Sequence, residues 1–365
     1  MRISLLEAYL VEIELKKPFR IALGEEVKVR NLIVKLETSD GLIGFGEAAP
    51  SEKILGDNVD IALGTIKELS PHIVGSDPTY IEPLDKVVSR GKSSSARAAL
   101  SIAIFDILGK HYGEPLYKLF GGSRERVETD YTIGIKKPEE MAEEAKELVK
   151  RGFRVLKVKL GEDPEVDLER IRLIRENIGS ATKIRVDANQ GWSFKDAKRV
   201  IDELERYDVE FVEQPLPAQR LDELASLRRQ VSLPIMVDES VHTARDLIKV
   251  IREEAADMVN IKLMKAGSLR EALKIAFIAE SCGMKCMIGC MGETGIGILA
   301  GVHFACGVGQ VEYVDLDADL MLKEDILSIK TYDIPYRIPP NRPGLGINEG
   351  DIRWDRLQKV YQYSK

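Results

Sequence analysis

The chain has few cysteines and histidines, no long apolar run and no excess of positive charge. Its 365 residues include four of each of the first two types, and the formal net charge is −7. No apolar stretch approaches the ~18 residues of a membrane-spanning segment, so we expect no membrane contact. The net charge and the lack of a concentrated basic patch argue against nucleic-acid binding.

The four cysteines are Cys282, Cys286, Cys290 and Cys306. The first three are spaced four residues apart, which could indicate a metal site. However, Cys286 and Cys290 belong to a strand-like run, whereas Cys282 ends the preceding helix, so the three would not share a helical face. We interpret all four as small buried side chains in a reducing compartment. Glutamates also interrupt the apolar N-terminal segment, and together these features predict a cytoplasmic protein without a signal peptide.

The pattern of apolar residues changes near position 126. Upstream, residues 3–15, 28–37 and 42–48 are typical of antiparallel strands, and residues 95–110 of a long buried helix. Downstream, eight strand-like runs alternate with charged helical stretches, which predicts parallel βαβ units that close into a barrel. The eight runs are 128–135, 155–160, 183–189, 209–215, 234–240, 257–263, 285–291 and 311–317.

We divide the chain into three parts on this basis. Residues 1–125 form an N-terminal α+β region, and residues 126–322 form the barrel, which carries the active site. Residues 323–365 are rich in proline and glycine and have no strand partner left in the barrel. We therefore expect this C-terminal segment to return to the N-terminal region.

Charged residues recur at the downstream ends of five consecutive barrel runs. They are Lys159, Asp187, Glu213, Asp238 and Lys262, at intervals of 28, 26, 25 and 24 residues. In barrels of this kind the catalytic groups lie at the carboxyl ends of the strands. The spacing therefore predicts that these five side chains meet in an active site.

The three acids in this series would be neighbours on one arc of the barrel rim. One aspartate at a strand end could equally cap the next helix, but three converging carboxylates would repel one another without a cation. A hard divalent ion such as Mg²⁺ removes the repulsion and keeps positions open for substrate and water, with Mn²⁺ as a substitute. We expect supporting contacts around these ligands from Asn189, Gln214 and Glu239.

Lys157 and Lys159 point to the same side of their strand, and two buried lysines are costly unless they are used. Lys262 ends the sixth strand, which lies opposite the second strand in an eight-stranded ring. Lys159 and Lys262 would thus face each other across the barrel mouth. This arrangement suits a two-base 1,1-proton transfer at a carbon next to a carboxylate, through a metal-stabilised enediolate. No histidine occupies a suitable strand end, which disfavours a histidine base.

The eighth run ends in Asp315 and Asp317, which share one face and lie opposite the metal arc. Two acids in this position could hold an ammonium group; alternatively, they cap a helix or are solvated. If they hold an ammonium, the substrate is a zwitterion longer than an amino acid, such as a dipeptide.

Taken together, these motifs resemble the muconate lactonizing enzyme subgroup of the enolase superfamily, and within it the dipeptide epimerases. The resemblance covers essentially the whole chain. Its motifs are KPF (17–19), GFGEA (44–48), TDYTIGI (129–135), KVK (157–159), DANQGW (187–192), EQP (213–215), DES (238–240), NIKLMKAG (260–267), GCMGE (289–293), DLD (315–317) and PGLGI (343–347).

The resemblance implies an α/β fold, a (β/α)₇β TIM-like barrel under an α+β capping domain made by both termini. It implies Mg²⁺ on the three strand-end acids, the two opposed lysines as the acid/base pair, and the DLD motif as a clamp for the substrate ammonium. It also implies substrate contacts from Thr132, Lys157 and Met291, and supporting roles for Lys265 and Glu293. Members often form symmetric oligomers, so a homo-oligomer is expected.

One segment departs from the relatives that act on Ala-Glu. Those epimerases carry a basic side chain near position 24, whereas this chain has Gly24 followed by two glutamates. Arg20 could substitute from a different position, and Ile54 could line the same pocket. We therefore expect hydrophobic or cationic dipeptides to be substrates at least as readily as Ala-Glu.

Two other functions are consistent with parts of this pattern. One is a lyase or cycloisomerase of the o-succinylbenzoate synthase or muconate cycloisomerase type, whose substrates lack the ammonium group. The other is a binding protein on an inactive barrel, which the five intact charged groups disfavour.

Overall fold

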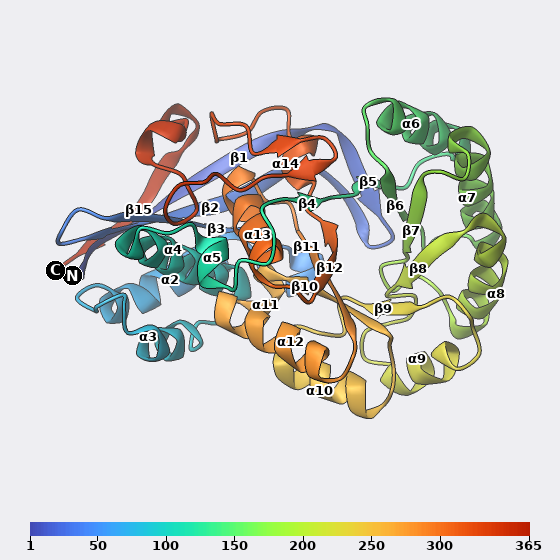
Figure 1. Cartoon of the computed structure of the whole chain (residues 1–365), viewed down its shortest axis with the longest axis horizontal. Helices are drawn as coiled ribbons and strands as arrows, with labels where there is room; N and C mark the ends of the chain where they lie inside the picture. The colour runs from blue at the N-terminus through green and yellow to red at the C-terminus, as the bar shows by residue number, and fades with distance from the viewer.

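The computed structural model describes all 365 residues and consists of a parallel barrel beside an antiparallel cap (Figure 1). One sheet has eight strands in the order β12–β11–β10–β9–β8–β7–β6–β5, which confirms the predicted fold class. The bounds of these strands are β5 Tyr131–Ile133, β6 Val155–Lys159, β7 Lys183–Asp187, β8 Val209–Glu213, β9 Ile235–Val237, β10 Met258–Lys262, β11 Lys285–Gly289 and β12 Val311–Asp315.

Helices connect the barrel strands and cover the barrel; most have one apolar side, whereas α13 is buried on all sides. In α7, for example, Asp163 caps the N-terminus by accepting hydrogen bonds from two backbone amides, and Pro164 occupies the first turn. Ile171 and Ile174 then bury the apolar side of this helix. The helices of the barrel are α6 Pro138–Lys150, α7 Pro164–Ile178, α8 Phe194–Leu204, α9 Leu221–Arg228, α10 Ala244–Arg252, α11 Leu263–Ala266, α12 Leu269–Ser281, α13 Gly295–Gly307 and α14 Ala318–Met321.

The first predicted barrel strand, 128–135, is divided in the structure. Its start, β4 (Val127–Glu128), pairs with β14 (Tyr336–Arg337), and only β5 pairs with β6. The division occurs because Asp130 turns to other partners: its carboxylate accepts a 2.7 Å hydrogen bond from Arg185, and its amide donates to Val314 O at 3.2 Å. This amide bond brings the first and last barrel strands together without a regular ladder.

The cap sheet has the order β15–β1–β2–β3. Its two central strands run beyond their predicted limits and form a long hairpin, which Figure 1 shows in blue extending toward β5. At the end of this hairpin, Ile135 N donates to Arg20 O at 2.8 Å. The strands and helices of this region are β1 Ile3–Ile21, β2 Gly24–Thr38, β3 Ile43–Ala48, α1 Glu52–Leu55, α2 Val59–Ile73, α3 Ile81–Val88, α4 Ser94–Tyr112 and α5 Leu116–Leu119.

Buried glutamate and glycine residues of β3 hold the cap together and join it to the barrel. A side chain on Gly46 would come within 2.0 Å of Ala99 O, so the glycine lets β3 lie directly on α4. Glu47, one residue along, accepts hydrogen bonds from Thr294 N at 2.8 Å and Gly297 N at 2.7 Å. A carboxylate at the N-terminus of α13 is a favourable charge–dipole arrangement, and it docks the cap on the barrel.

The C-terminal segment crosses from the barrel to the cap. It contains a short hairpin, β13 (Tyr332–Asp333) and β14, and ends in β15 (Gln358–Ser364), which pairs with β1. Arg337 in β14 is completely buried and donates to both oxygens of Asp319, at 2.9 and 2.6 Å. This ion pair ties the C-terminal segment to α14, the short helix that follows β12.

The structure also bears on the expectations about the cysteines and about membrane-spanning segments. Cys282 is exposed, so its interpretation as a buried side chain was wrong; Cys286 and Cys306 are buried, and Cys290 is half-buried. The last helical turn of α12 places Cys282 at the surface. None of the helices combines the length and the apolar character that crossing a membrane requires.

We expect Arg337→Met to destabilise the fold strongly. It leaves the Asp319 carboxylate buried without its cation, and breaking a buried pair in this way costs about 3–5 kcal/mol. The midpoint of urea unfolding should fall, and Asp319→Leu in the same chain should restore part of the loss. An unchanged midpoint in Arg337→Met would show that the pair does not hold the segment.

Candidate active site

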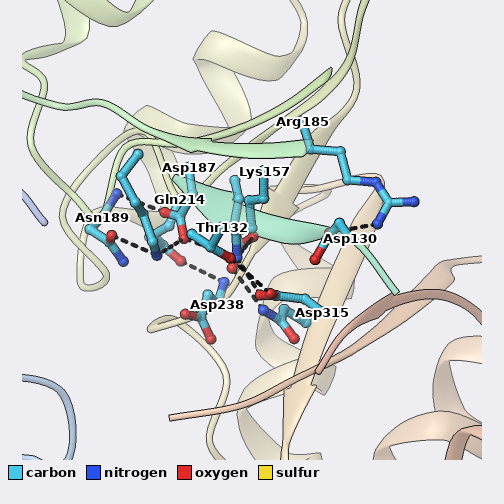
Figure 2. A network of polar contacts seen from close by, with 12 residues as sticks. Asp130, Thr132, Lys157, Arg185, Asp187, Asn189, Gln214, Asp238 and Asp315 are labelled. Atoms are coloured by element: carbon cyan, nitrogen blue, oxygen red, sulfur yellow. Dashed lines mark hydrogen bonds and ion pairs between the residues drawn. The ribbon is translucent and has the colours of Figure 1, made fainter. Parts of the chain in front are cut away.

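A buried ammonium group lies at the centre of the site. Lys157 Nζ is 2.8 Å from Asp315, 2.7 Å from Glu213 and 3.1 Å from Asp187. Figure 2 shows Lys157 with Asp187 and Asp315. Burial by itself lowers the pKa of Lys157, but the surrounding carboxylates raise it well above the ordinary lysine value. Lys157 therefore stays charged and acts as a counter-ion.

The two opposed lysines line one cavity of about 440 Å³. Lys159 Nζ donates to Asp187 at 2.6 Å and to Asn189 at 3.0 Å, whereas Lys262 Nζ donates to Asp238 at 2.7 Å. Burial lowers the pKa of Lys262, but the carboxylate of Asp238 outweighs it and raises the pKa above its usual value. Lys262 is thus held in the ammonium form, which can donate a proton.

The three strand-end acids, Asp187, Glu213 and Asp238, are completely buried. Glu213 Oε2 and Asp238 Oδ1 make no hydrogen bond of good geometry, although Lys157 Nζ lies 2.7 Å from the first and Lys265 Nζ 2.5 Å from the second. Three buried carboxylates, two of them with an oxygen free of hydrogen bonds, provide the hard donor set that Mg²⁺ prefers. The residues present therefore fit a magnesium ion.

Polar side chains lie beside these acids. Asn189 Nδ2 donates to Glu239 at 3.1 Å, and Gln214 Oε1 accepts from Asp238 N at 2.9 Å. Asn189 and Gln214 have φ values of 40° and 36°, a conformation that is unfavourable for side chains other than glycine. Such strain is typical of functional sites, where the surrounding contacts impose it.

The remaining two supporting residues differ in their surroundings. Lys265 contacts Asp238 and donates to Asn260 O at 3.0 Å, so it belongs to the same cluster. Glu293 is buried on the cap side, where burial and the charge of Glu47 raise its pKa to about 8. Its Oε2 atom has no hydrogen-bond partner.

The two acids after β12 have unequal environments. Asp315 pairs with Lys157 and accepts from Thr132 Oγ1 at 3.1 Å. Asp317 accepts from Thr132 N at 2.6 Å, lines the cavity and forms no ion pair. Burial and the charge of Asp315 raise the pKa of Asp317 to about 7. Of the two acids, Asp315 has a cation within ion-pair distance and Asp317 has none. Cys290 completes a group with both acids in which the ligand atoms lie within 4.8 Å of one another.

Two family sequence models match most of the chain. Residues 5–121 match the mandelate racemase / muconate lactonizing enzyme N-terminal domain, and residues 140–349 match the enolase C-terminal domain-like family. The chain belongs to the mandelate racemase / muconate lactonizing enzyme family. This result confirms the resemblance that the motifs indicate.

Known members of the family resemble the chain over nearly its full length. An L-Ala-D/L-Glu epimerase of Clostridium acetobutylicum is 39% identical over 92% of this chain and 96% of its own. A hydrophobic dipeptide epimerase of Enterococcus faecalis is 41% identical over 88% of this chain and 92% of its own. A crystal structure of a dipeptide epimerase from Enterococcus faecalis, with Mg and L-Leu-L-Tyr, has a TM-score of 0.93 at 39% identity, covering 95% of this chain and 99% of that one.

The cap of this family member forms the outer wall of the cavity. Gly24, Ile54 and Met291 line it as expected, but Arg20 does not. Arg20 pairs with Glu162 at 2.5 Å instead. Side chains alternate along a strand, and because Phe19 and Ile21 line the cavity, the residue between them faces away. The expectation that Arg20 receives the substrate is therefore not met.

Sequence reasoning missed several residues of the site. Asn260 donates a hydrogen bond to Glu213 at 2.8 Å, and Arg185 donates one to Asp130 at 2.7 Å. Asn260 lies two residues before Lys262, so strand alternation could have placed it on the same face. Arg185 lies two residues before Asp187, so the same alternation could have placed it on the side of the strand that Asp187 faces.

We expect Gly289→Ala to disturb this site. A methyl group there would come within 2.7 Å of the Asn260 side chain and 3.1 Å of Lys262 Cε. Overpacking of this kind costs about 1–3 kcal/mol, so the thermal unfolding midpoint should fall. Gly64→Ala is the matched control, because it lies in α2 with open space around it, and it should be neutral or stabilise by up to about 1 kcal/mol. Equal midpoints for the two variants would contradict the close packing.

Proposed function

We propose that this chain is a Mg²⁺-dependent dipeptide epimerase that inverts the α-carbon of the C-terminal residue. The observation that carries the proposal is one cavity lined by Lys159, Lys262 and the unpaired Asp317. The two lysines stand on β6 and β10, and the strands between them in the sheet lead to the three acids. The dipeptide epimerases among the relatives, one of them seen with Mg and a dipeptide, support the same reaction.

Asp187, Glu213 and Asp238 would hold the metal. When bound there, Mg²⁺ supplies positive charge that stabilises the negative charge developing on the substrate carboxylate. Lys157 keeps the same acids ionised and oriented through its contacts with two of them. Its ammonium also adds positive charge beside the reacting centre.

The proton is moved by the two opposed lysines. Inversion requires one neutral amine to remove the α-proton and one ammonium to deliver a proton to the other face. Lys159 and Lys262 approach from opposite sides of the cavity, so each can serve as base for one stereoisomer and as acid for the other. Both are less than a tenth exposed, and this burial keeps bulk water from competing for the proton.

The substrate ammonium would be bound by Asp317. Asp315 already has a cation in Lys157, and it fixes Thr132, whose amide in turn holds Asp317. A carboxylate without an ion pair in the same cavity favours a substrate that carries an ammonium group as well as a carboxylate. This feature disfavours a lyase or cycloisomerase, whose substrates lack the ammonium group. A homo-oligomeric state, a cytoplasmic location and the use of Mn²⁺ stay predictions.

Exchange of the α-proton with deuterium from D₂O tests the two-base assignment. Lys159→Ala and Lys262→Ala should each lower epimerisation by about 10²–10⁴-fold, the usual contribution of a general base. Each variant should still exchange the α-proton of one stereoisomer, because the opposite lysine survives. Lys195→Ala, at an exposed position on α8, is the control and should be unaffected. Retained epimerisation in either active-site variant would rule out the two-base reaction.

The role of Asp317 is tested with blocked and free dipeptides. Asp317→Asn should raise KM for a free dipeptide by about 10- to 100-fold, because it removes a charge-assisted hydrogen bond to the ammonium. The same variant should leave Mg²⁺ affinity and the KM of an N-acetylated dipeptide nearly unchanged. Equal effects on free and acetylated substrates would show that Asp317 does not bind the ammonium.

A further inference from the structure

The cap contributes three cations to the wall of the cavity, and all three are engaged by glutamates. Lys53 Nζ lies 2.9 Å from Glu26 Oε1. Lys28 and Arg30 both pair with Glu12, at 2.8 and 2.9 Å. A substrate with an acidic side chain would therefore compete with a glutamate for each of these cations.

The acids of the same wall also have partners within the protein. Glu26 has Lys53, and Glu52 accepts from Asn58 at 2.8 Å. Asp57 is buried at the N-terminus of α4, where one oxygen accepts from the hydroxyls of Ser93 and Ser95, both at 2.6 Å. Its second oxygen has no partner, which makes a cationic side chain the main rival occupant.

Gly24 makes the pairing of Lys53 and Glu26 possible. A side chain at position 24 would come within 2.6 Å of Lys53 Nζ and 3.0 Å of its Cε. Lys53 therefore occupies the space that a larger residue would take, and it lies against the hairpin, where Glu26 is available. Both side chains are partly exposed, at 35% and 61%, so the pair contributes little to stability. Its effect is to cancel two charges at the cavity.

Building on the proposed function, we infer that the C-terminal residue of the dipeptide carries an apolar side chain, and that the Lys53–Glu26 pair enforces this choice. A substrate carboxylate that binds Lys53 remains beside Glu26, and an ammonium that binds Glu26 remains beside Lys53. Neither charge gains a net attraction. The apolar side chains of the wall are left to contact the substrate, and they include Phe19, Ile21, Val29, Ile54, Met291 and Met321.

Selectivity ratios test the inference. Deuterium exchange gives kcat/KM for L-Ala-L-Leu, L-Ala-L-Glu and L-Ala-L-Lys, and the native enzyme should favour the first by about tenfold or more, the effect of leaving a charge unpaired. Glu26→Gln leaves Lys53 uncompensated and should raise the Glu/Leu ratio by about fivefold or more. Lys53→Met should raise the Lys/Leu ratio in the same way. A variant that only disturbs the fold lowers all three values and leaves the ratios unchanged.

Glu25→Gln is the matched control. Glu25 is the neighbouring exposed acid on the hairpin and does not line the cavity, so its loss should not change the Glu/Leu ratio. A native enzyme that prefers L-Ala-L-Glu or L-Ala-L-Lys would overturn the inference and leave the proposed function intact. Equal changes of the Glu/Leu ratio in the Glu25 and Glu26 variants would have the same meaning. Absence of exchange with every dipeptide would overturn the proposed function, and the inference with it.

Discussion

The site depends on one buried ion cluster, the ammonium of Lys157 among the carboxylates of Asp187, Glu213 and Asp315. Acids this close, with no solvent, would otherwise repel one another or take up protons. The lysine favours the ionised form of each, and it connects two of the acids proposed to hold the metal with Asp315. The barrel strands that carry these residues are therefore linked by charge at their carboxyl ends as well as by their hydrogen-bond ladder.

Much of this arrangement could be predicted because a parallel barrel repeats. A charged residue every 24 to 28 positions identifies the strand ends, and alternation along a strand identifies the inward side chains. Prediction failed where the partner is distant in sequence. Nothing near Asp130 indicates that Arg185 and Val314 will divide the first strand. Arg20 was misplaced because the length of the β1–β2 hairpin, which decides where Phe19 and Ile21 point, depends on its docking against the barrel.

The structure separates the chemistry from the choice of side chain. In the proposed reaction, the lysines and acids of the barrel act on groups that every dipeptide has. The cap supplies the wall of the cavity that is proposed to contact the variable side chain, through the β1–β2 hairpin and α1. Glu47 joins the two parts at the N-terminus of α13. Residues of the cap can therefore change without disturbing the proton-transfer groups, which suits a family with many substrates on one scaffold.

The pairing of β1 with β15 has a consequence for the order of folding. Leu5 in β1 pairs with Ser364 in β15, so the two strands of this pair are separated by almost the whole sequence. Contacts between residues so far apart form slowly, because the intervening chain must be ordered first. The barrel, whose neighbouring strands follow one another in the sequence, can thus assemble before the cap sheet gains its edge strand.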